Sequence, residues 1–308
     1  MIILWLFLST TLLLLAILTA LAWAGSSKLM ARRVPNPQTS PADLGLIFED
    51  VSFQSRDGLT LRGWFIPANP AKPAVIFCHG HAGSMDPDVA YVPWFHAAGF
   101  SVLMFDFRAH GRSEGNRVSL GYFERQDLLG AVDYLQGRGI MEVGVMGFSM
   151  GGAVGITTAA QCESIRATVS DGGFAHLESA VVGWGLGRGA PHWLALSLAR
   201  LIITVAGWRL GVRLTEADPL RWVTHIAPRA VLFVHGDRDI FVPVADVEAL
   251  YARAGEPKEL WRVAEAEHRR VDRLRPEEYR KRVIDFFERH LADAASTTKH
   301  SLDNLHSV

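Results

Sequence analysis

The chain has 308 residues, 49% of them hydrophobic, and its 31 basic and 32 acidic side chains give a formal net charge of -1. A chain of this size supplies one large core, so one sizeable domain is expected. The balanced charge gives no electrostatic reason to expect a polyanionic partner, so no nucleic-acid partner is expected. The two cysteines, Cys78 and Cys162, lie in apolar settings, and their spacing indicates neither a disulfide framework nor a metal site.

The first segment, residues 1–24, carries no charged side chain and is rich in Leu, Ile, Ala, Trp and Phe. A helix of about 20 such residues spans a bilayer, which predicts a transmembrane anchor. The alternative is a cleavable signal peptide, because Ala22-Trp23-Ala24 before Gly25 offers small residues for cleavage. The anchor is preferred, since no basic residue precedes the apolar run and the run is longer than the roughly 7 to 15 residues usual for the hydrophobic region of a signal peptide.

Basic residues follow the apolar run, at Lys28, Arg32 and Arg33. By the positive-inside rule they predict that the following domain faces the cytoplasm. A cleaved chain would instead be secreted or periplasmic. Residues 25–45 contain a run rich in Pro and polar residues, and they are expected to form a linker between membrane and domain.

The domain is predicted over residues 46–291, followed by a polar tail at 292–308. It begins with two runs rich in β-branched and aromatic residues, 48–55 and 59–66, whose separation by Arg-Asp-Gly predicts a hairpin. Fully apolar runs then predict further strands, at 74–78, 101–105, 143–147, 167–170 and 230–235. Helical patterns lie between and after them, at 123–137, 150–161, 244–254 and 276–290. Strands that are apolar on both faces and alternate with helices indicate an α/β fold with a mostly parallel sheet.

One segment, about residues 176–222, interrupts this alternation with tryptophans set among Gly, Leu and Ile. An inserted helical cap is expected there. Its apolar surface could be packed inside the cap, form an acyl-chain pocket, or dip into lipid. Trp184, Trp193 and Trp208 are therefore candidate substrate contacts. Two arginines interrupt the apolar run, so a second transmembrane helix is not expected, whereas an interfacial helix is compatible with the sequence.

A candidate nucleophile lies in the motif Gly-Phe-Ser-Met-Gly at residues 147–151. The motif follows a predicted strand and opens a predicted helix, which is the context that a G-x-S-x-G nucleophile elbow requires. Glycines on both sides allow the sharp turn that leaves the Ser149 hydroxyl exposed. In another context the same pentapeptide would be an ordinary glycine-rich turn.

A candidate oxyanion hole is predicted beside this turn. The loop His-Gly-His-Ala-Gly, residues 79–83, follows the strand at 74–78, and its backbone can offer one N–H group. The backbone N–H groups of His81 and Met150 are the candidate donor pair. Metal ligation by the His81 side chain is the weaker alternative.

Two further residues complete a candidate triad. Asp239 lies in an acidic turn after the strand at 230–235, and His268 lies in a loop before the last helix. Asp239 would orient His268, and His268 would take the proton from Ser149. The order Ser, Asp, His is the one found in α/β-hydrolases. Asp171, at the end of the preceding strand, is an alternative acid whose simpler role is a turn or cap.

With these residues the chain resembles the α/β-hydrolase superfamily, and within it the serine-aminopeptidase-like and α/β-hydrolase-domain-containing groups, over about residues 46–291. The likeness also depends on Asp-Gly-Leu-Thr-Leu-Arg-Gly-Trp at 57–64 and on Asp-Phe-Arg-Ala-His-Gly-Arg-Ser-Glu-Gly at 106–115. The resemblance implies a structural, buried role for Asp106 and Arg108. The chain departs from the family at residues 264–268, Ala-Glu-Ala-Glu-His, where a Gly-x-Gly-His sequence is usual.

These observations predict a serine hydrolase that cleaves ester, thioester or amide bonds through an acyl-enzyme on Ser149. The predicted anchor and apolar cap favour lipid-like or acyl substrates near a membrane. Two alternatives are kept: an aminopeptidase acting on small peptides, and a catalytically silent membrane-bound scaffold that retains the fold. No cofactor or metal is expected.

Overall fold

The computed structural model describes residues 1–305, with side chains described as far as Leu291, so the last three residues of the predicted tail lie outside the described residues. Eight strands form one sheet in the order β1-β2-β4-β3-β5-β6-β7-β8. The strands are β1 Glu49–Gln54, β2 Thr60–Ile66, β3 Ala74–Cys78, β4 Ser101–Phe105, β5 Val143–Phe148, β6 Ile165–Asp171, β7 Ala230–Gly236 and β8 Lys258–Val263. Among the pairs of neighbouring strands in this sheet, β1–β2 and β2–β4 are antiparallel and the others are parallel. The predicted hairpin and mostly parallel sheet are confirmed.

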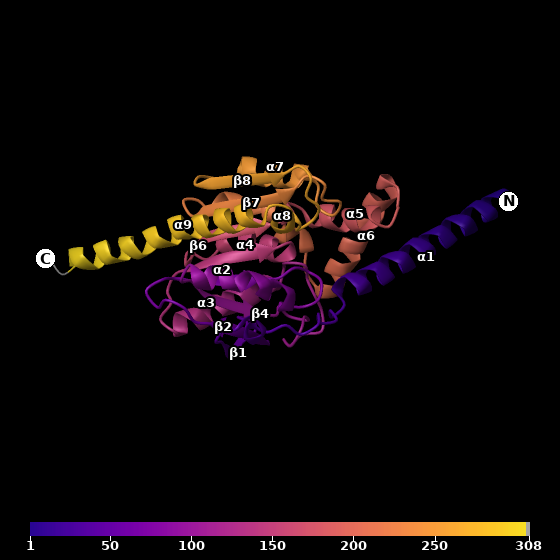
Figure 1. Cartoon of the computed structure of the whole chain (residues 1–308). Helices are drawn as coiled ribbons and strands as arrows, with labels where there is room; N and C mark the ends of the chain where they lie inside the picture. The colour runs from indigo at the N-terminus through magenta and orange to yellow at the C-terminus, as the bar shows by residue number, and fades with distance from the viewer. Residues whose placement is uncertain (306–308) are drawn as a thin grey trace.

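Helices cover both faces of the sheet (Figure 1). They are α1 Ile2–Met30, α2 Val92–Ala97, α3 Glu124–Gly137, α4 Met150–Ala159, α5 Leu177–Leu186, α6 His192–Leu210, α7 Val244–Arg253, α8 Val271–Leu274 and α9 Pro276–Leu305. Short 3-10 helices are η1 Pro41–Leu44, η2 Asp86–Tyr91, η3 Leu214–Ala217, η4 Pro219–Arg221 and η5 Val223–His225.

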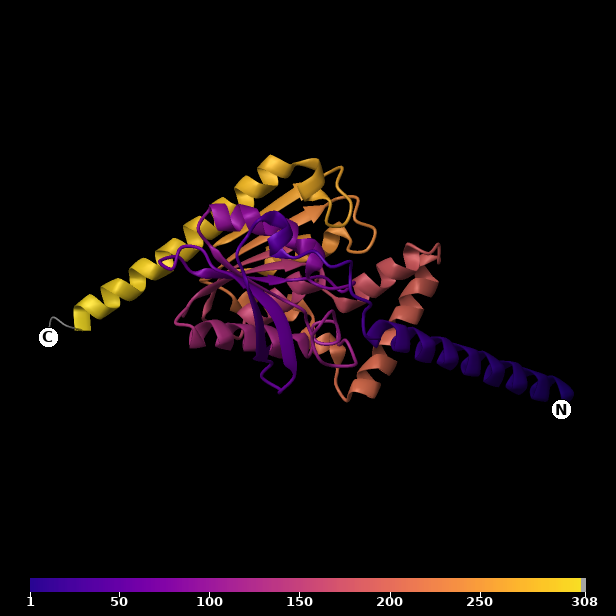
Figure 2. The same cartoon turned by 60° about the horizontal axis from the view of Figure 1, so that its bottom comes forward.

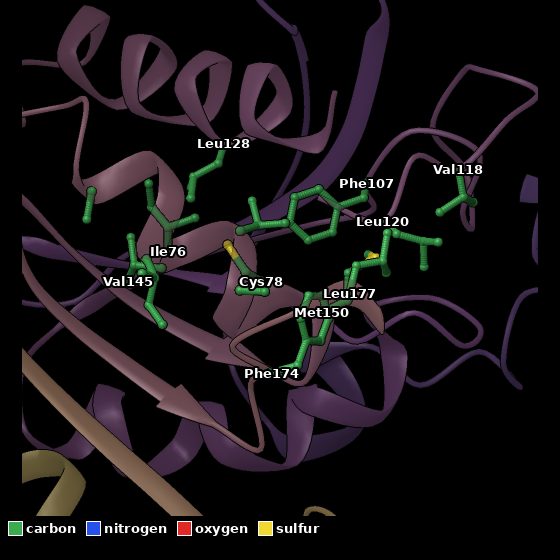
Figure 3. Packing of buried hydrophobic residues seen from close by; sticks show 14 of the residues in the cluster. Ile76, Cys78, Phe107, Val118, Leu120, Leu128, Val145, Met150, Phe174 and Leu177 are labelled. Atoms are coloured by element: carbon green, nitrogen blue, oxygen red, sulfur yellow. The ribbon is translucent and has the colours of Figure 1, made fainter. Parts of the chain in front are cut away.

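The alternation of side chains along β3 shows how the two layers form. Ile76 and Cys78 pack in one cluster with α3, α4 and α7, whereas Val75 and Phe77 pack in a second cluster with α2 and α9. Figure 3 shows Ile76 and Cys78 close to Leu128 of α3. Successive residues of a strand point to opposite faces, so a strand covered on both sides must be apolar throughout.

The insertion between β6 and β7 contains α5, α6 and the three 3-10 helices η3, η4 and η5, as the interrupted alternation predicts. Two buried carboxylates hold the start of α5. Asp218 accepts a hydrogen bond from the Leu177 N–H at 2.9 Å, and Asp246 accepts one from the Ala175 N–H at 2.7 Å. The first N–H groups of a helix lack partners within it, so Asp218 satisfies one of them, while Asp246 holds the segment just before the helix.

Helix α1 extends further than the predicted anchor. Residues 25–30, which the sequence assigns to the linker, are helical and pack against α6. The helix continues because no proline occurs before residue 35, and because Arg33 donates a hydrogen bond to the Leu29 carbonyl at 2.7 Å near its end. Figures 1 and 2 show α1 leaving the body of the molecule beside α6 and projecting away from the sheet.

The other end of the chain also differs from its prediction. Helix α9 continues to Leu305, so most of the predicted tail at 292–308 has a helical backbone. Residues 292–305 contain neither Gly nor Pro, the two residues that most often end a helix. Within the described part of the chain, α1 and α6 are the two helices long and apolar enough to cross a membrane.

Candidate active site

Ser149 occupies a strained turn between β5 and α4, with φ 53° and ψ -115°. The turn is tight enough that a Cβ on Gly151 would lie 1.9 Å from the Cys78 carbonyl oxygen, and one on Gly147 would lie 2.5 Å from the Gly151 oxygen. The Ser149 N–H donates to the Asp171 carbonyl at 2.8 Å, which ties the turn to the neighbouring strand. A side chain at either glycine would collide with the backbone packed against it, so both positions require glycine.

The predicted triad residues meet in space. His268 Nε2 lies 3.0 Å from Ser149 Oγ, and His268 Nδ1 lies 2.5 Å from Asp239 Oδ2. The other carboxylate oxygen of Asp239 accepts the N–H groups of Phe241 and Val242 at 2.8 and 2.9 Å. The Asp239 side chain is 1% exposed and cannot turn away from these partners without losing them. This geometry can move a proton from the serine hydroxyl to the imidazole.

Asp171, the alternative acid, is brought to a different partner. Its carboxylate accepts a hydrogen bond from the Tyr279 hydroxyl at 2.8 Å, and both side chains are buried. Burial raises the pKa of the Asp171 carboxyl to about 6. Asp239 is thus the carboxylate that contacts Nδ1 of His268, and Asp171 contacts the elbow through its backbone carbonyl.

The loop at 79–83 lies against the nucleophile, and the buried His79 side chain orients it. His79 Nδ1 donates to the Gly80 carbonyl at 2.7 Å, and its Nε2 accepts the Phe107 N–H at 3.0 Å. Burial holds the pKa of His79 well below its ordinary value, which keeps this neutral form. In a trans peptide the C=O and N–H point in opposite directions, so fixing the Gly80 oxygen also fixes the His81 N–H.

The side chain of His81 is engaged away from any metal-like cluster. Its Nε2 is paired with the Arg33 guanidinium, and burial, followed by the charge of Arg33, lowers its pKa to about 3. No group of three His, Cys, Asp or Glu side chains among the described residues is arranged to hold a metal ion. Among the described residues, His81 therefore has no neighbouring side chains with which it could bind a metal ion.

Arg269, directly after the histidine, is a site residue that the sequence reasoning missed. It adopts φ 52°, its guanidinium lies 4.2 Å from the Phe148 ring centre, and it donates to Asp88 at 2.6 Å. The buried carboxylate Asp88 gave no signal in the sequence, because it lies 181 positions away along the chain. These contacts hold the loop that carries His268, even though larger residues replace the glycines usual there.

An apolar cavity of about 310 Å³ opens over Ser149. Helix α5 contributes Leu177, Ala180, Val181 and Trp184 to its wall, and α1 contributes Leu29. Three further wall residues, Leu120, Met150 and Phe174, also belong to the core beneath the site (Figure 3). The cavity can therefore take an apolar group whose reactive carbonyl lies at the serine.

The structure corrects the prediction for two of the cap tryptophans. Trp184 lines the cavity as expected, but Trp193 and Trp208 do not, and their side chains are 69% and 74% exposed. The reason is that α5 forms the cavity wall, while both of these tryptophans belong to α6, which packs behind it.

Asp106 and Arg108 lie below the site in buried networks, in agreement with the structural role implied by the family resemblance. Asp106 accepts the backbone N–H groups of Met85 and Arg112, each at 2.9 Å. Arg108 donates to Asp57 and Asp127 at 2.6 Å each. Neither side chain lines the cavity.

Comparison with known proteins identifies the family and the fold. The family model described as serine aminopeptidase S33 matches residues 69–231, more than half of the chain. The uncharacterized protein YfhR of Salmonella typhi is 30% identical, over 71% of this chain and 74% of its own length. The uncharacterized protein YqkD of Bacillus subtilis is 29% identical, over 75% and 76%. The esterase Pf2001 of Pyrococcus furiosus superposes with a TM-score of 0.69 at 29% identity, covering 84% of this chain and 98% of that one. The chain has the α/β-hydrolase fold and belongs to the serine aminopeptidase S33 family.

Proposed function

We propose that this hydrolase is a membrane-anchored serine esterase or thioesterase that transfers an apolar acyl group to Ser149. The observation that carries the proposal is the hydrogen-bonded chain from Ser149 through His268 to Asp239, which opens into an apolar cavity. A silent scaffold would have no need for this chain, because an elbow held in a strained conformation is unfavourable for stability.

In the proposed reaction, Ser149 Oγ attacks the acyl carbonyl carbon while its proton passes to His268 Nε2. Asp239 keeps the other imidazole nitrogen protonated and stabilises the charge on the ring. The negative oxygen of the tetrahedral intermediate is held by the N–H groups of His81 and Met150. His268 then gives its proton to the leaving alcohol or thiol, and the acyl-enzyme forms. Water next attacks the acyl carbonyl carbon while His268 takes its proton, and the carboxylic acid leaves as His268 returns the proton to Ser149 Oγ.

The lining of the cavity supports an acyl substrate over a peptide amine. Recognition of a free amino terminus calls for a buried or partly buried carboxylate. Within the described part of the chain, the residues that line the cavity include no Asp or Glu, and their titratable members are His81, His268 and Arg269. The esterase from Pyrococcus furiosus, at 29% identity, supports the same choice.

The membrane location is proposed from α1. Its residues 2–21 are uncharged, mostly apolar and almost entirely exposed, an arrangement that water does not stabilise and a bilayer does. The orientation of the domain toward the cytoplasm stays a prediction from Lys28, Arg32 and Arg33. Digestion of the domain by protease added to intact spheroplasts would contradict it.

The dependence of rate on acyl length tests the proposed substrate. Full-length protein in detergent is expected to hydrolyse p-nitrophenyl octanoate with at least tenfold higher kcat/KM than p-nitrophenyl acetate, since each buried CH₂ contributes about 0.8 kcal/mol. Aminoacyl p-nitroanilides are expected to react far more slowly than either ester. Faster release from aminoacyl substrates would favour the aminopeptidase. Absence of ester turnover and of fluorophosphonate labelling in folded protein would favour the scaffold.

His79 gives a test of the proposed oxyanion hole. Replacing His79 with Ala is expected to lower kcat by about 10- to 100-fold with little change in KM, because the His81 N–H loses its fixed direction; loss of a whole donor lowers kcat by about 10²- to 10³-fold. His79→Asn, which keeps an N–H near the position of Nδ1, is expected to lose less. His225→Ala, at an exposed position, is the control. Equal kcat for His79→Ala and the control would contradict this role.

A further inference from the structure

Helix α1 has two parts with different surroundings. Residues 2–21 are exposed except for Leu18, which is partly buried, whereas Ala22, Ser26, Leu29 and Met30 are buried against the domain. Twenty helical residues measure about 30 Å, which equals the thickness of the hydrocarbon layer of a bilayer. The free part of α1 is therefore long enough to span the membrane, and the docked part begins at the membrane surface.

The docked part is held by specific contacts with α6. A Cβ on Gly25 would lie 2.5 Å from the Cδ1 atom of Ile202, so the two helices touch closely at this point. Arg209 donates to the hydroxyls of Ser26 and Ser27 at 2.7 and 2.8 Å, and its guanidinium lies 4.3 Å from the Trp23 ring centre. These contacts join the end of the membrane helix to the cap, not merely to a loose linker.

The docking places α6 beside the predicted membrane surface. In Figures 1 and 2 α6 crosses α1 where α1 leaves the domain. Trp208 lies 6.3 Å from Trp23 between ring centres, and the exposed Trp193 lies near the other end of α6. Tryptophan and arginine are the residues that favour the boundary between lipid and water, so both ends of α6 suit this boundary.

The same docking brings α1 into the active site. Leu29 lines the cavity over Ser149, and the Nζ atom of its neighbour Lys28 lies 5.5 Å from the ring centre of Trp184, another wall residue. Leu29 follows the free part of α1 by eight residues, or about 12 Å of helix. The cavity wall thus lies close to the headgroup layer.

We propose that the docked end of α1 forms part of the entrance to the cavity and that substrates enter it from the bilayer. The substrate class is then an amphiphilic acyl ester or thioester resident in the membrane, with its acyl chain passing between Leu29 of α1 and the wall of α5. This inference rests on the proposed acyl-transfer function of Ser149, and it adds a route and a role for the anchor beyond attachment.

Undocking of α1 tests the route with the full chain in phosphatidylcholine vesicles. Gly25→Leu inserts a side chain against Ile202, while Ala24→Leu inserts the same side chain at the neighbouring exposed position. Neither change weakens the helix, since Leu is a good helix former. Two rates are measured: hydrolysis of water-soluble p-nitrophenyl acetate, and hydrolysis of 4-methylumbelliferyl oleate incorporated in the vesicles.

We expect Gly25→Leu to lower the ratio of the oleate rate to the acetate rate at least tenfold, and Ala24→Leu to change it less than about twofold. Adding Ile202→Ala to Gly25→Leu makes room for the new side chain and is expected to restore most of the ratio. An unchanged ratio in Gly25→Leu, an equal fall in both rates, or a lack of rescue would overturn the route. If the proposed acyl-transfer function were wrong, and not only the entry route, the wild-type protein would hydrolyse neither ester and would take no fluorophosphonate label.

Discussion

Replacing Ser149 with alanine is expected to abolish covalent labelling by a fluorophosphonate and to lower kcat for ester hydrolysis on the order of 10⁶-fold, the loss known for a serine nucleophile in a hydrolase triad. The reason is that His268 and the N–H groups of His81 and Met150 then act only on an attacking water. Labelling and steady-state rates in the same membrane preparation check this. Ser170→Ala, which removes a buried hydroxyl behind the elbow, is the matched control and should label like wild type.

The strain at the elbow gives this experiment a second measurement. Ser149 has φ 53°, and such a conformation is unfavourable by about 1 to 3 kcal/mol for a residue with a Cβ. Ser149→Gly removes that strain and Ser149→Ala retains it, so the glycine variant should unfold at the higher temperature. Continued labelling of both variants would show that another residue is the nucleophile.

The second large effect is expected at the acid. Asp239→Asn should lower kcat by about 10⁴-fold, because an amide favours the wrong tautomer of His268, whereas Asp171→Asn should retain most of the activity. Comparing the activities of these two variants decides which carboxylate assists His268, since the two residues lie at or just after the ends of the neighbouring strands β6 and β7. A larger loss in Asp171→Asn than in Asp239→Asn would reverse the assignment.

Asp171→Asn should instead change how stability depends on pH. The folded-state pKa of Asp171 is raised to about 6 by burial, above its unfolded value near 4. The contribution of Asp171 to the free energy of unfolding is therefore fully present below pH 4. It is lost as pH rises through 6, by about 3 kcal/mol in total. Arg269, Tyr279, Asp272 and His268 face this carboxyl and are unchanged in the variant. Urea unfolding at pH 4.5 and 7.5 checks this through the difference in unfolding free energy between wild type and Asp171→Asn, which should shift in favour of the variant at the higher pH. Other buried groups that titrate in this range, such as His79 and His81, are common to both proteins and cancel in that difference.

The inner strands of the sheet could be predicted from the sequence because they have no exposed face. A run such as Ala74–Cys78 must be apolar at every position, and this pattern is visible without any tertiary information. The elbow was predictable for a similar reason, since Gly147 and Gly151 are dictated by local backbone contacts. Asp239 and His268 followed from their order and from the turns that carry them.

What the sequence did not predict depends on contacts between distant segments. The pairing of Arg269 with Asp88 and of Arg33 with His81 joins residues 181 and 48 positions apart, so neither has a local signature. The roles of Trp193 and Trp208 were mispredicted because composition does not show which of two cap helices faces the cavity. The helical end of α1 was assigned to a linker because proline and polar residues begin only a few positions later.

The helical state of α1 near Gly25 has a consequence for processing of the chain. The bond after Ala24, the candidate cleavage site, lies inside a continuous helix, and Gly25 is packed against Ile202. Proteolytic cleavage favours exposed loops whose backbone is free of hydrogen bonds, so cutting here requires both unwinding and release of the helix. Folding of the domain onto α1 therefore ends the interval in which a peptidase could separate the two.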